Sequence, residues 1–137
     1  MNLIPVTRSN SLLRVSDTLT WKHDGLVPAP ERLLLGLRPE KFVLRAGGEG
    51  LIPAQVVVVE RLGAETVIGC RLLSAEANDG ARLLEHDLVF VKISGSPRIR
   101  IDDRCALDYR PEDVVWFDQT SGVRIPPAAA AIAQIAS

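Results

Sequence analysis

Short apolar or alternating runs, separated by turn-forming residues, follow one another along most of the chain. Runs of this kind that are rich in Val, Ile and Leu predict short β-strands. Clusters of Gly, Pro, Asn, Asp and Ser between them predict turns. The pattern therefore predicts an all-β fold, a small barrel or a sandwich. The predicted strands are residues 2–6, 11–15, 32–38, 54–62, 66–73, 87–93 and 105–110, and the predicted turns are residues 23–25, 28–31, 46–50, 77–80 and 94–97.

The segment VVVVERLGAETVIGCRL, residues 56–72, predicts a β-hairpin. Its two strand-like runs flank LGAE, in which Gly63 can supply the positive φ that a tight turn often needs. The run of valines indicates a strand that is covered on both faces or strongly coiled in a barrel. A loop that contacts a ligand is the alternative for the turn. Glu60 and Glu65 stand on opposite sides of it, an arrangement more typical of a solvated edge than of a catalytic acid–base pair.

One phrase occurs twice, as LGLRPEKFVL at residues 35–44 and as LDYRPEDVVW at residues 107–116, seventy-two positions apart. A three-residue word recurs by accident in a chain of this length, so RPE alone is weak evidence for a repeat. The flanks strengthen it, because apolar residues occupy equivalent places on both sides of the word. The repeat suggests two related sub-barrels, or one barrel elaborated with pseudo-symmetry.

The backbone preferences of the Arg-Pro-Glu sequence predict a corner, that is, a sharp change of chain direction between two strands. Proline disfavours helical backbone for the residue before it, so the arginine stays extended at the end of a strand. Proline suits the first position of a helical turn, and a glutamate is favoured in that first turn. Each phrase therefore encodes a strand, a single helical turn and a second strand. The Arg and Glu side chains either cap the turn and cover the end of the barrel, or form ion pairs at an interface. The candidate structural or interface residues are Arg38, Pro39, Glu40, Arg110, Pro111 and Glu112 in the corners, with Gly63 and Glu65 in the hairpin turn.

Composition narrows the possible functions. The 137 residues suffice for one domain or two very small ones, and 47% of them are hydrophobic, so the chain should fold. A net charge of −1 gives no electrostatic footprint for nucleic acid. No apolar run approaches the ~20 residues of a membrane span, and no export signal opens the sequence.

Few residues in the chain offer catalytic or metal-binding chemistry. Cys70 and Cys105 match no metal or redox spacing and are expected to be buried, reduced thiols. His23 and His86, each beside an aspartate in a predicted loop or strand edge, do not make a metal site without further ligands. No nucleophile motif such as G-x-S-x-G is present. We therefore expect neither an enzyme nor a metalloprotein.

The two RPE phrases, the hairpin between them and the closing FDQTSG (117–122) resemble a known family. They look like the C-terminal TOBE (transport-associated OB) region of ATP-binding subunits of maltose-type and glycerol-3-phosphate-type ABC importers. The opening MNLIPV resembles the phrase at which that family passes from its ATPase domain to its regulatory domain. The resemblance implies an OB-type β-barrel fold over residues 1–125, built as two intertwined OB-like halves. Residues 126–137 would be an Ala-rich C-terminal tail.

The resemblance also implies a function. The domain would be the accessory, regulatory and dimerisation part of the ATP-binding subunit of an importer for sugars, polyols or glycerol-3-phosphate. Its partners would be a second copy, the ABC nucleotide-binding domain of the same chain and, indirectly, permease subunits, but no nucleic acid. It would lie in the cytoplasm, peripheral to the inner membrane.

The sequence contains no G-x-x-x-x-G-K-[ST] phosphate loop, no ABC signature and no Asp-Glu pair for Mg²⁺. We therefore expect no ATPase activity and no cofactor in this chain, and ATP and Mg²⁺ would belong to the parent ATPase domain. The remaining alternative is a stand-alone OB-type module for a small oxyanion or another small ligand. KISGSPR (92–98) is the stretch that could bind such an oxyanion, although it also reads as a plain turn. Nucleic acid is disfavoured, because the aromatic residues fall mostly in strand runs where core packing is expected.

Overall fold

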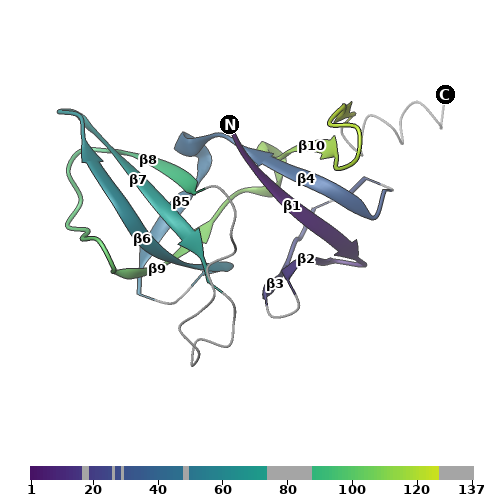
Figure 1. Cartoon of the computed structure of the whole chain (residues 1–137), viewed down its shortest axis with the longest axis horizontal. Helices are drawn as coiled ribbons and strands as arrows, with labels where there is room; N and C mark the ends of the chain where they lie inside the picture. The colour runs from purple at the N-terminus through teal and green to yellow at the C-terminus, as the bar shows by residue number, and fades with distance from the viewer. Residues whose placement is uncertain (17–18, 26, 29, 48–49, 74–87, 127–137) are drawn as a thin grey trace.

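Two antiparallel β-sheets make up the described part of the chain, which is all-β apart from two single 3₁₀ turns (Figure 1). A computed structural model describes residues 1–16, 19–25, 27–28, 30–47, 50–73 and 88–126. The predicted turn at 77–80, His86 and nearly all of the Ala-rich tail lie outside these residues. The predicted all-β fold, with a single helical turn at each RPE corner, is confirmed.

The first sheet, sheet A, has six strands in the order β11-β10-β4-β1-β2-β3. It contains both the beginning and the end of the described chain. In sequence order its strands are β1 (Asn2–Ser9), β2 (Leu12–Ser16), β3 (Leu19–Lys22), β4 (Arg32–Leu37), β10 (Val115–Asp118) and β11 (Arg124–Ile125).

The second sheet, sheet B, has five strands in the order β5-β9-β6-β7-β8. Its longest strand, β6, carries a register shift between Val56 and Val58, which is a bulge of the kind that increases strand coiling. The run of valines is thus a coiled strand, with Val56 fully buried and Val58 exposed. The strands are β5 (Val43–Ala46), β6 (Ile52–Arg61), β7 (Glu65–Leu72), β8 (Val89–Ser94) and β9 (Arg104–Asp108).

All seven strands predicted from apolar runs are present, with ends shifted by a few residues. The two RPE phrases also lead into strands, β5 and β10, as predicted. The predicted strands do not include β3 or the two-residue β11, although Leu-Thr-Trp-Lys in β3 alternates buried and exposed residues as a strand does. Both are edge strands of sheet A, and each has a single neighbour that it pairs with. Pairing with that neighbour holds these segments extended, and Thr20 and Trp21 in β3 also favour a strand.

The two RPE phrases carry the chain between the sheets. β4 of sheet A leads through the 3₁₀ helix η1 (Pro39–Lys41) into β5 of sheet B. β9 of sheet B leads back through the 3₁₀ helix η3 (Pro111–Asp113) into β10 of sheet A. The predicted corner is therefore the crossing point between two sheets, and the chain passes it once in each direction (Figure 1).

The strand registers show that the two crossings are related by a local pseudo-twofold. β5 pairs with β9 so that Val43 lies opposite Asp108, and β4 pairs with β10 so that Gly36 lies opposite Val115. The two copies of the phrase are seventy-two positions apart. Moving forward from Val43 by this offset leads to Val115, and moving back from Asp108 by the same offset leads to Gly36. The other pairs of these two ladders obey the same relation. The sequence repeat and the strand pairing thus express one symmetry.

The sheets share one hydrophobic core. Its fully buried members come from both sheets and include the equivalent residues Leu35 and Leu107. Leu35 lies between Ile4 and Trp116 on neighbouring strands, and Leu107 lies between Leu44 and Ile52. The repeated apolar positions around RPE are therefore the places where each sheet contributes to the common core.

Candidate functional site

The two corners have the backbone that their sequence predicts. Arg38 (φ −71°, ψ 147°) and Arg110 (φ −92°, ψ 128°) are extended, and each is followed by a proline that opens a single 3₁₀ turn. The glutamate lies in the first turn of each. Neither arginine side chain forms a capping hydrogen bond at its turn. That the Arg and Glu side chains together cap the turns and cover the end of the barrel stays a prediction. Pro39, Pro111 and the extended residue before each set the corner by backbone preference alone.

The charged groups of the two corners are exposed and differ between the copies. Arg110 donates from Nε to Oε1 of Glu112 at 3.1 Å. This bond raises the pKa of Arg110 and lowers the pKa of Glu112. Among the described residues, neither Arg38 nor Glu40 forms an ion pair.

One charge contact joins the two corners. Nζ of Lys41 in η1 lies 4.0 Å from Oδ1 of Asp113 in η3. The turns therefore lie side by side, and together they present a small surface of mixed charge. A role for this surface in an interface stays a prediction.

A buried polar chain lies at the second corner. Tyr109, the residue before Arg110, accepts a hydrogen bond from Nε1 of Trp21 at 2.8 Å. The tyrosine hydroxyl also lies 2.8 Å from Nδ1 of His23. Because the hydroxyl accepts from Trp21, its own proton is free to be donated to Nδ1, which fits a neutral histidine with its proton on Nε2. Burial raises the pKa of Tyr109 to about 12 and lowers the pKa of His23, against the opposing charge of Asp24.

Aromatic rings pack around this chain. The ring of His23 meets Trp116 edge-on at a centroid distance of 5.4 Å, and Phe42 meets Tyr109 edge-on at 6.5 Å. Phe42 follows the first corner and Trp116 follows the second, so both crossings contribute to the same cluster. Gly25 allows the close approach here, since a Cβ on it would lie 2.9 Å from both Nε2 of His23 and Cβ of Pro111. The cluster is a packed junction, and the histidine expected at a loop or strand edge is buried.

The hairpin turn is confirmed as a tight connection between β6 and β7. Gly63 has φ +78°, and Leu62 donates its N–H to the carbonyl of Glu65 at 2.8 Å. The Glu65 carboxylate pairs with Nζ of Lys92 on β8 at 3.2 Å. Glu65 is therefore engaged in a cross-strand ion pair, the exposed-edge role that the sequence favours. A contribution of Gly63 or Glu65 to an interface stays a prediction.

The KISGSPR stretch uses its polar groups within the protein. Gly95 donates its N–H to the carbonyl of Ala64 at 2.7 Å, and the Ser96 hydroxyl accepts from Arg61 at 2.6 Å. An oxyanion at this place would have to displace these bonds.

The two thiols are free and buried, as expected. Cys70 lies opposite Val56 and Cys105 opposite Ala54, so they flank β6 from its two neighbouring strands. The hydrogen bond to Cys105 and burial raise the pKa of Cys70. Within residues 1–126, gaps excepted, no group of three or more His, Cys, Asp or Glu side chains is placed to hold a metal ion.

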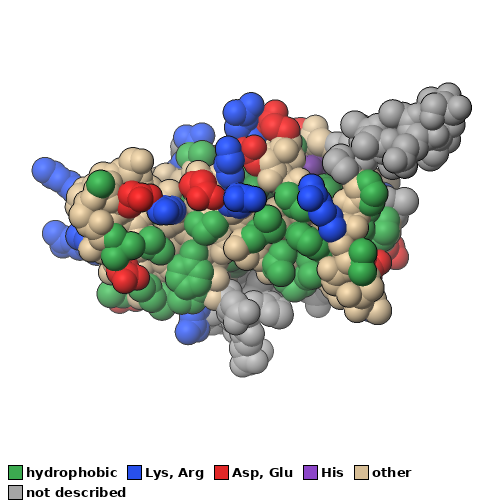
Figure 2. Space-filling model, turned by 90° about the horizontal axis from the view of Figure 1, so that it is seen from above, with side chains coloured by type: hydrophobic (Ala, Val, Ile, Leu, Met, Phe, Trp, Pro, Cys, Tyr) green, Lys and Arg blue, Asp and Glu red, His purple; other side chains and the backbone are tan. Residues whose placement is uncertain are grey.

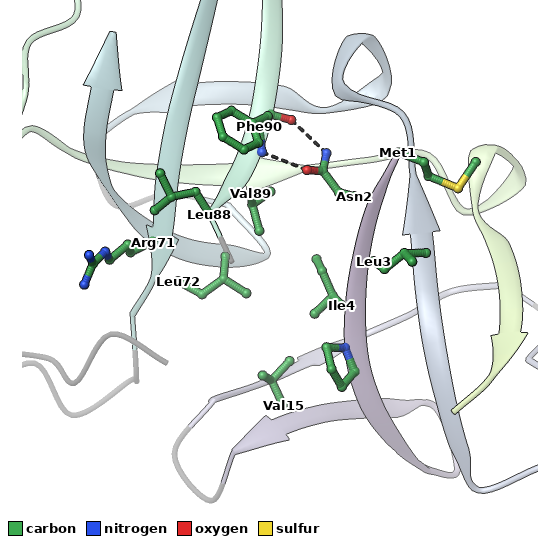
Figure 3. Close-up of a pocket in the computed structure, with 11 residues that line it drawn as sticks. Met1, Asn2, Leu3, Ile4, Val15, Arg71, Leu72, Leu88, Val89 and Phe90 are labelled. Atoms are coloured by element: carbon green, nitrogen blue, oxygen red, sulfur yellow. Dashed lines mark hydrogen bonds between the residues drawn. The ribbon is translucent and has the colours of Figure 1, made fainter. Parts of the chain in front are cut away.

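A cleft with a volume of about 530 Å³ lies between the start of β1, the end of β7 and the start of β8 (Figure 3). Its lining is mostly apolar, and it comes from segments that are far apart in the sequence. This cleft could not be predicted from the sequence, because none of its apolar residues differs in kind from a core residue. The one available signal is Asn2, a polar residue within an apolar strand, which is 9% exposed.

None of the helices in the described part of the chain has the length and hydrophobicity that a membrane crossing requires. Comparison with known proteins gives a sharper result. The sequence profile of the TOBE domain family matches residues 35–117. This match begins in the first copy of the repeated phrase and ends just after the second.

Curated relatives extend the similarity. The chain is 29% identical over 136 residues to the sn-glycerol-3-phosphate import ATP-binding protein UgpC of Cupriavidus metallidurans, covering 91% of this chain and 34% of the relative. It is 44% identical over 81 residues to the maltose/maltodextrin import ATP-binding protein MalK of Vibrio vulnificus, covering 57% of this chain and 22% of the relative. The UgpC protein of Cupriavidus pinatubonensis is 27% identical over 140 residues, covering 91% of this chain and 35% of the relative. The chain thus spans about a third of the length of the UgpC relatives that it matches.

Proposed function

Because this chain belongs to the TOBE domain family, we propose that it is the regulatory domain of the ATP-binding subunit of an ABC importer. The observation that carries the proposal is the alignment of 91% of the chain with an import ATP-binding protein. We propose a sugar, a polyol or glycerol-3-phosphate as the imported solute, and the relatives named for sn-glycerol-3-phosphate import and for maltose/maltodextrin import support this choice. In this role the domain lies at the cytoplasmic face of the inner membrane as a peripheral part of the transporter. The ATP-binding domain and the permease subunits would hold it there.

The proposal assigns no chemical step to this chain. Its buried polar groups at the second corner are satisfied by one another, and its corner charges are exposed and of both signs. ATP and Mg²⁺ would be bound by the ATP-binding domain. The domain would therefore regulate the importer through its contacts with other proteins and not through a chemical step of its own.

We further propose that the domain associates with a second copy of itself. Exposed apolar side chains support this, because an interface core draws on such surface. Hydrophobic side chains gather on the face shown in Figure 2, with charged side chains among them. The large exposed hydrophobic residues are Met1, Leu3, Leu12, Val43, Val58, Leu62, Phe90, Ile101 and Val123.

An antibody raised against this chain tests the importer role in the source cells. The proposal expects a band about three times the mass of the 14.9 kDa chain, in the membrane fraction, that is released by alkaline wash. A soluble band at the mass of the chain itself would overturn the proposal and favour an independent module. Sedimentation velocity over a concentration series tests self-association separately, since a monomer at all concentrations would remove the dimer and leave the importer role standing.

A further inference from the structure

The cleft of Figure 3 lies along a strand edge with no partner strand in the described part of the chain. β1 pairs with β4 from Asn2 to Thr7, but its pairing with β2 begins only at Thr7. Over residues 3–5 the other edge of β1 therefore faces the cleft. This is an unusual place for an open edge, because β1 is an interior strand of sheet A.

The direction of the free backbone groups follows from one hydrogen bond. Arg8 donates its N–H to the carbonyl of Glu31, on the side where β4 lies. Because N–H and C=O groups alternate sides along a strand, those of Ile4 point toward β4 and those of Leu3 point toward the cleft. Pro5 also points its carbonyl toward the cleft, and its lack of an N–H costs nothing there. The edge thus offers one donor and two acceptors to an incoming strand.

The side chain of Asn2, at one end of the cleft, forms hydrogen bonds of the kind that an added strand would form. The Asn2 carboxamide donates from Nδ2 to the carbonyl of Phe90 at 2.8 Å and accepts the N–H of Phe90 at Oδ1 at 2.8 Å. A side-chain amide here makes the two bonds that a main-chain residue makes in an antiparallel pair. Gly95 donates to Ala64 on the β7 side, so by alternation Phe90 presents its groups to the opposite, free edge of β8. The Asn2 carboxamide therefore closes one end of the cleft with strand-like pairing.

The walls of the cleft suit an extended chain that carries apolar side chains. Leu72 and Ile4 line its buried part, and Leu3 and Phe90 lie at its rim with 52% and 38% of their surfaces exposed. Among the described residues that line the cleft, Arg71 is the only one with a charged side chain. Among the described residues, no acidic side chain lies within ion-pair distance of Arg71.

We propose that this cleft binds an extended peptide segment of a partner protein, which pairs with the free edge of β1 and carries an acidic residue for Arg71. Main-chain bonds to Leu3 and Pro5 supply affinity, and apolar side chains of the segment fill the cleft, as in other cases of strand addition. The carboxylate supplies charge complementarity and orients the segment. This inference goes beyond the proposed function, and the observations behind it all come from residues that the structure describes.

Panning a display library of random decapeptides against the intact chain tests the inference. We expect enriched peptides in which apolar residues alternate and at least one Asp or Glu recurs at a fixed place. Their affinity should fall about tenfold on Arg71→Glu, because an attractive pair becomes a repulsive one. Arg98→Glu is the matched control, because Arg98 is an exposed arginine beyond the opposite end of β8, and affinity should not change.

The Leu3 amide provides a readout that places the peptide. Saturating peptide should slow hydrogen exchange of the Leu3 N–H at least tenfold, as expected for an amide that enters a ladder. Failure to enrich any peptide, or equal affinity for the chain and its Arg71→Glu variant, would overturn the proposal. Protection of the Leu3 N–H that rises with protein concentration and without peptide would also overturn it, and would assign the edge to a second copy of the chain.

Discussion

The first and second corners share one backbone but differ in what packs beneath it. Leu37 precedes Arg38 and is fully buried among apolar side chains. Tyr109 stands at the equivalent place before Arg110, and it binds Trp21 and His23 through its hydroxyl. The comparison shows that the word RPE determines the local backbone, whereas the neighbouring residue determines whether the corner is held by apolar packing alone or by a polar chain as well.

The largest effect is expected where the two copies are alike. Leu35→Ala and Leu107→Ala each remove a fully buried side chain at equivalent positions of the repeat. Each should lower the free energy of unfolding by about 2–5 kcal/mol, through lost transfer energy and the cavity that remains. Urea denaturation of the two variants measures this. A loss confined to one variant would show that the two sheets do not share one cooperative core.

A smaller effect should separate the corners. Tyr109→Phe removes the hydroxyl and leaves the Trp21 N–H and His23 Nδ1 without their partner. The free energy of unfolding should fall by about 1–3 kcal/mol, the usual cost of unsatisfied buried polar groups. Leu37→Met at the equivalent place of the first corner keeps volume and polarity, so it should cost below about 1.5 kcal/mol. Equal losses in the two variants would contradict a stabilising role for the polar chain.

The polar chain should also make stability depend on pH. Burial lowers the pKa of His23 from its ordinary 6.5, so the unfolded chain takes up the proton at higher pH than the folded protein. Stability from neutral His23 is therefore complete above about pH 6.5 and declines as the pH falls below that value. Urea denaturation at pH 7.5 and pH 5.5 should show the decline. His23→Asn retains an acceptor without titrating, and an unchanged pH dependence in this variant would assign the decline to other groups.

The smallest effect is expected for the exposed charges. Glu112→Gln breaks the ion pair with Arg110, whereas Glu40 has no equivalent pair, and both glutamates are exposed. Because water screens exposed pairs, neither Glu112→Gln nor Glu40→Gln should measurably change the midpoint of urea denaturation. A clear loss in Glu112→Gln alone would mean that the ion pair helps to hold the second corner.

Local features of the fold could be predicted from the sequence, because their causes are local. Local sequence determines the backbone conformation at the proline of each RPE word, at Gly63 in its turn and in the alternating runs. Pairing between distant segments could not be predicted in the same way. The identity of the corners as crossings between sheets depends on β4 meeting β10 and β5 meeting β9.

The candidate residues show the same limit. His23 lies directly after β3, at the strand edge where it is expected, but its burial could not be predicted because its partners, Tyr109 and Trp116, come more than eighty positions later. Phe90 lies in a strand run, yet it is partly exposed because it belongs to the outer face of β8. The open edge of β1 had no signal, since it arises from where β2 stops pairing. Such features depend on which distant segments contact each other in the fold, and these contacts cannot be predicted from a single sequence.

The two crossings also impose an order in which the chain can fold. Every strand of sheet B comes from one uninterrupted stretch between the corners, residues 43–108, whereas sheet A is assembled from segments before and after that stretch. A ribosome therefore delivers all of sheet B before β10 exists to pair with β4. Until then the β10 side of β4 is an uncovered apolar strand edge, the kind of surface that invites aggregation during synthesis. Truncations that remove β10 and β11, the last strands in the described part of the chain, should therefore leave sheet A incomplete and expose part of the core that the two sheets share.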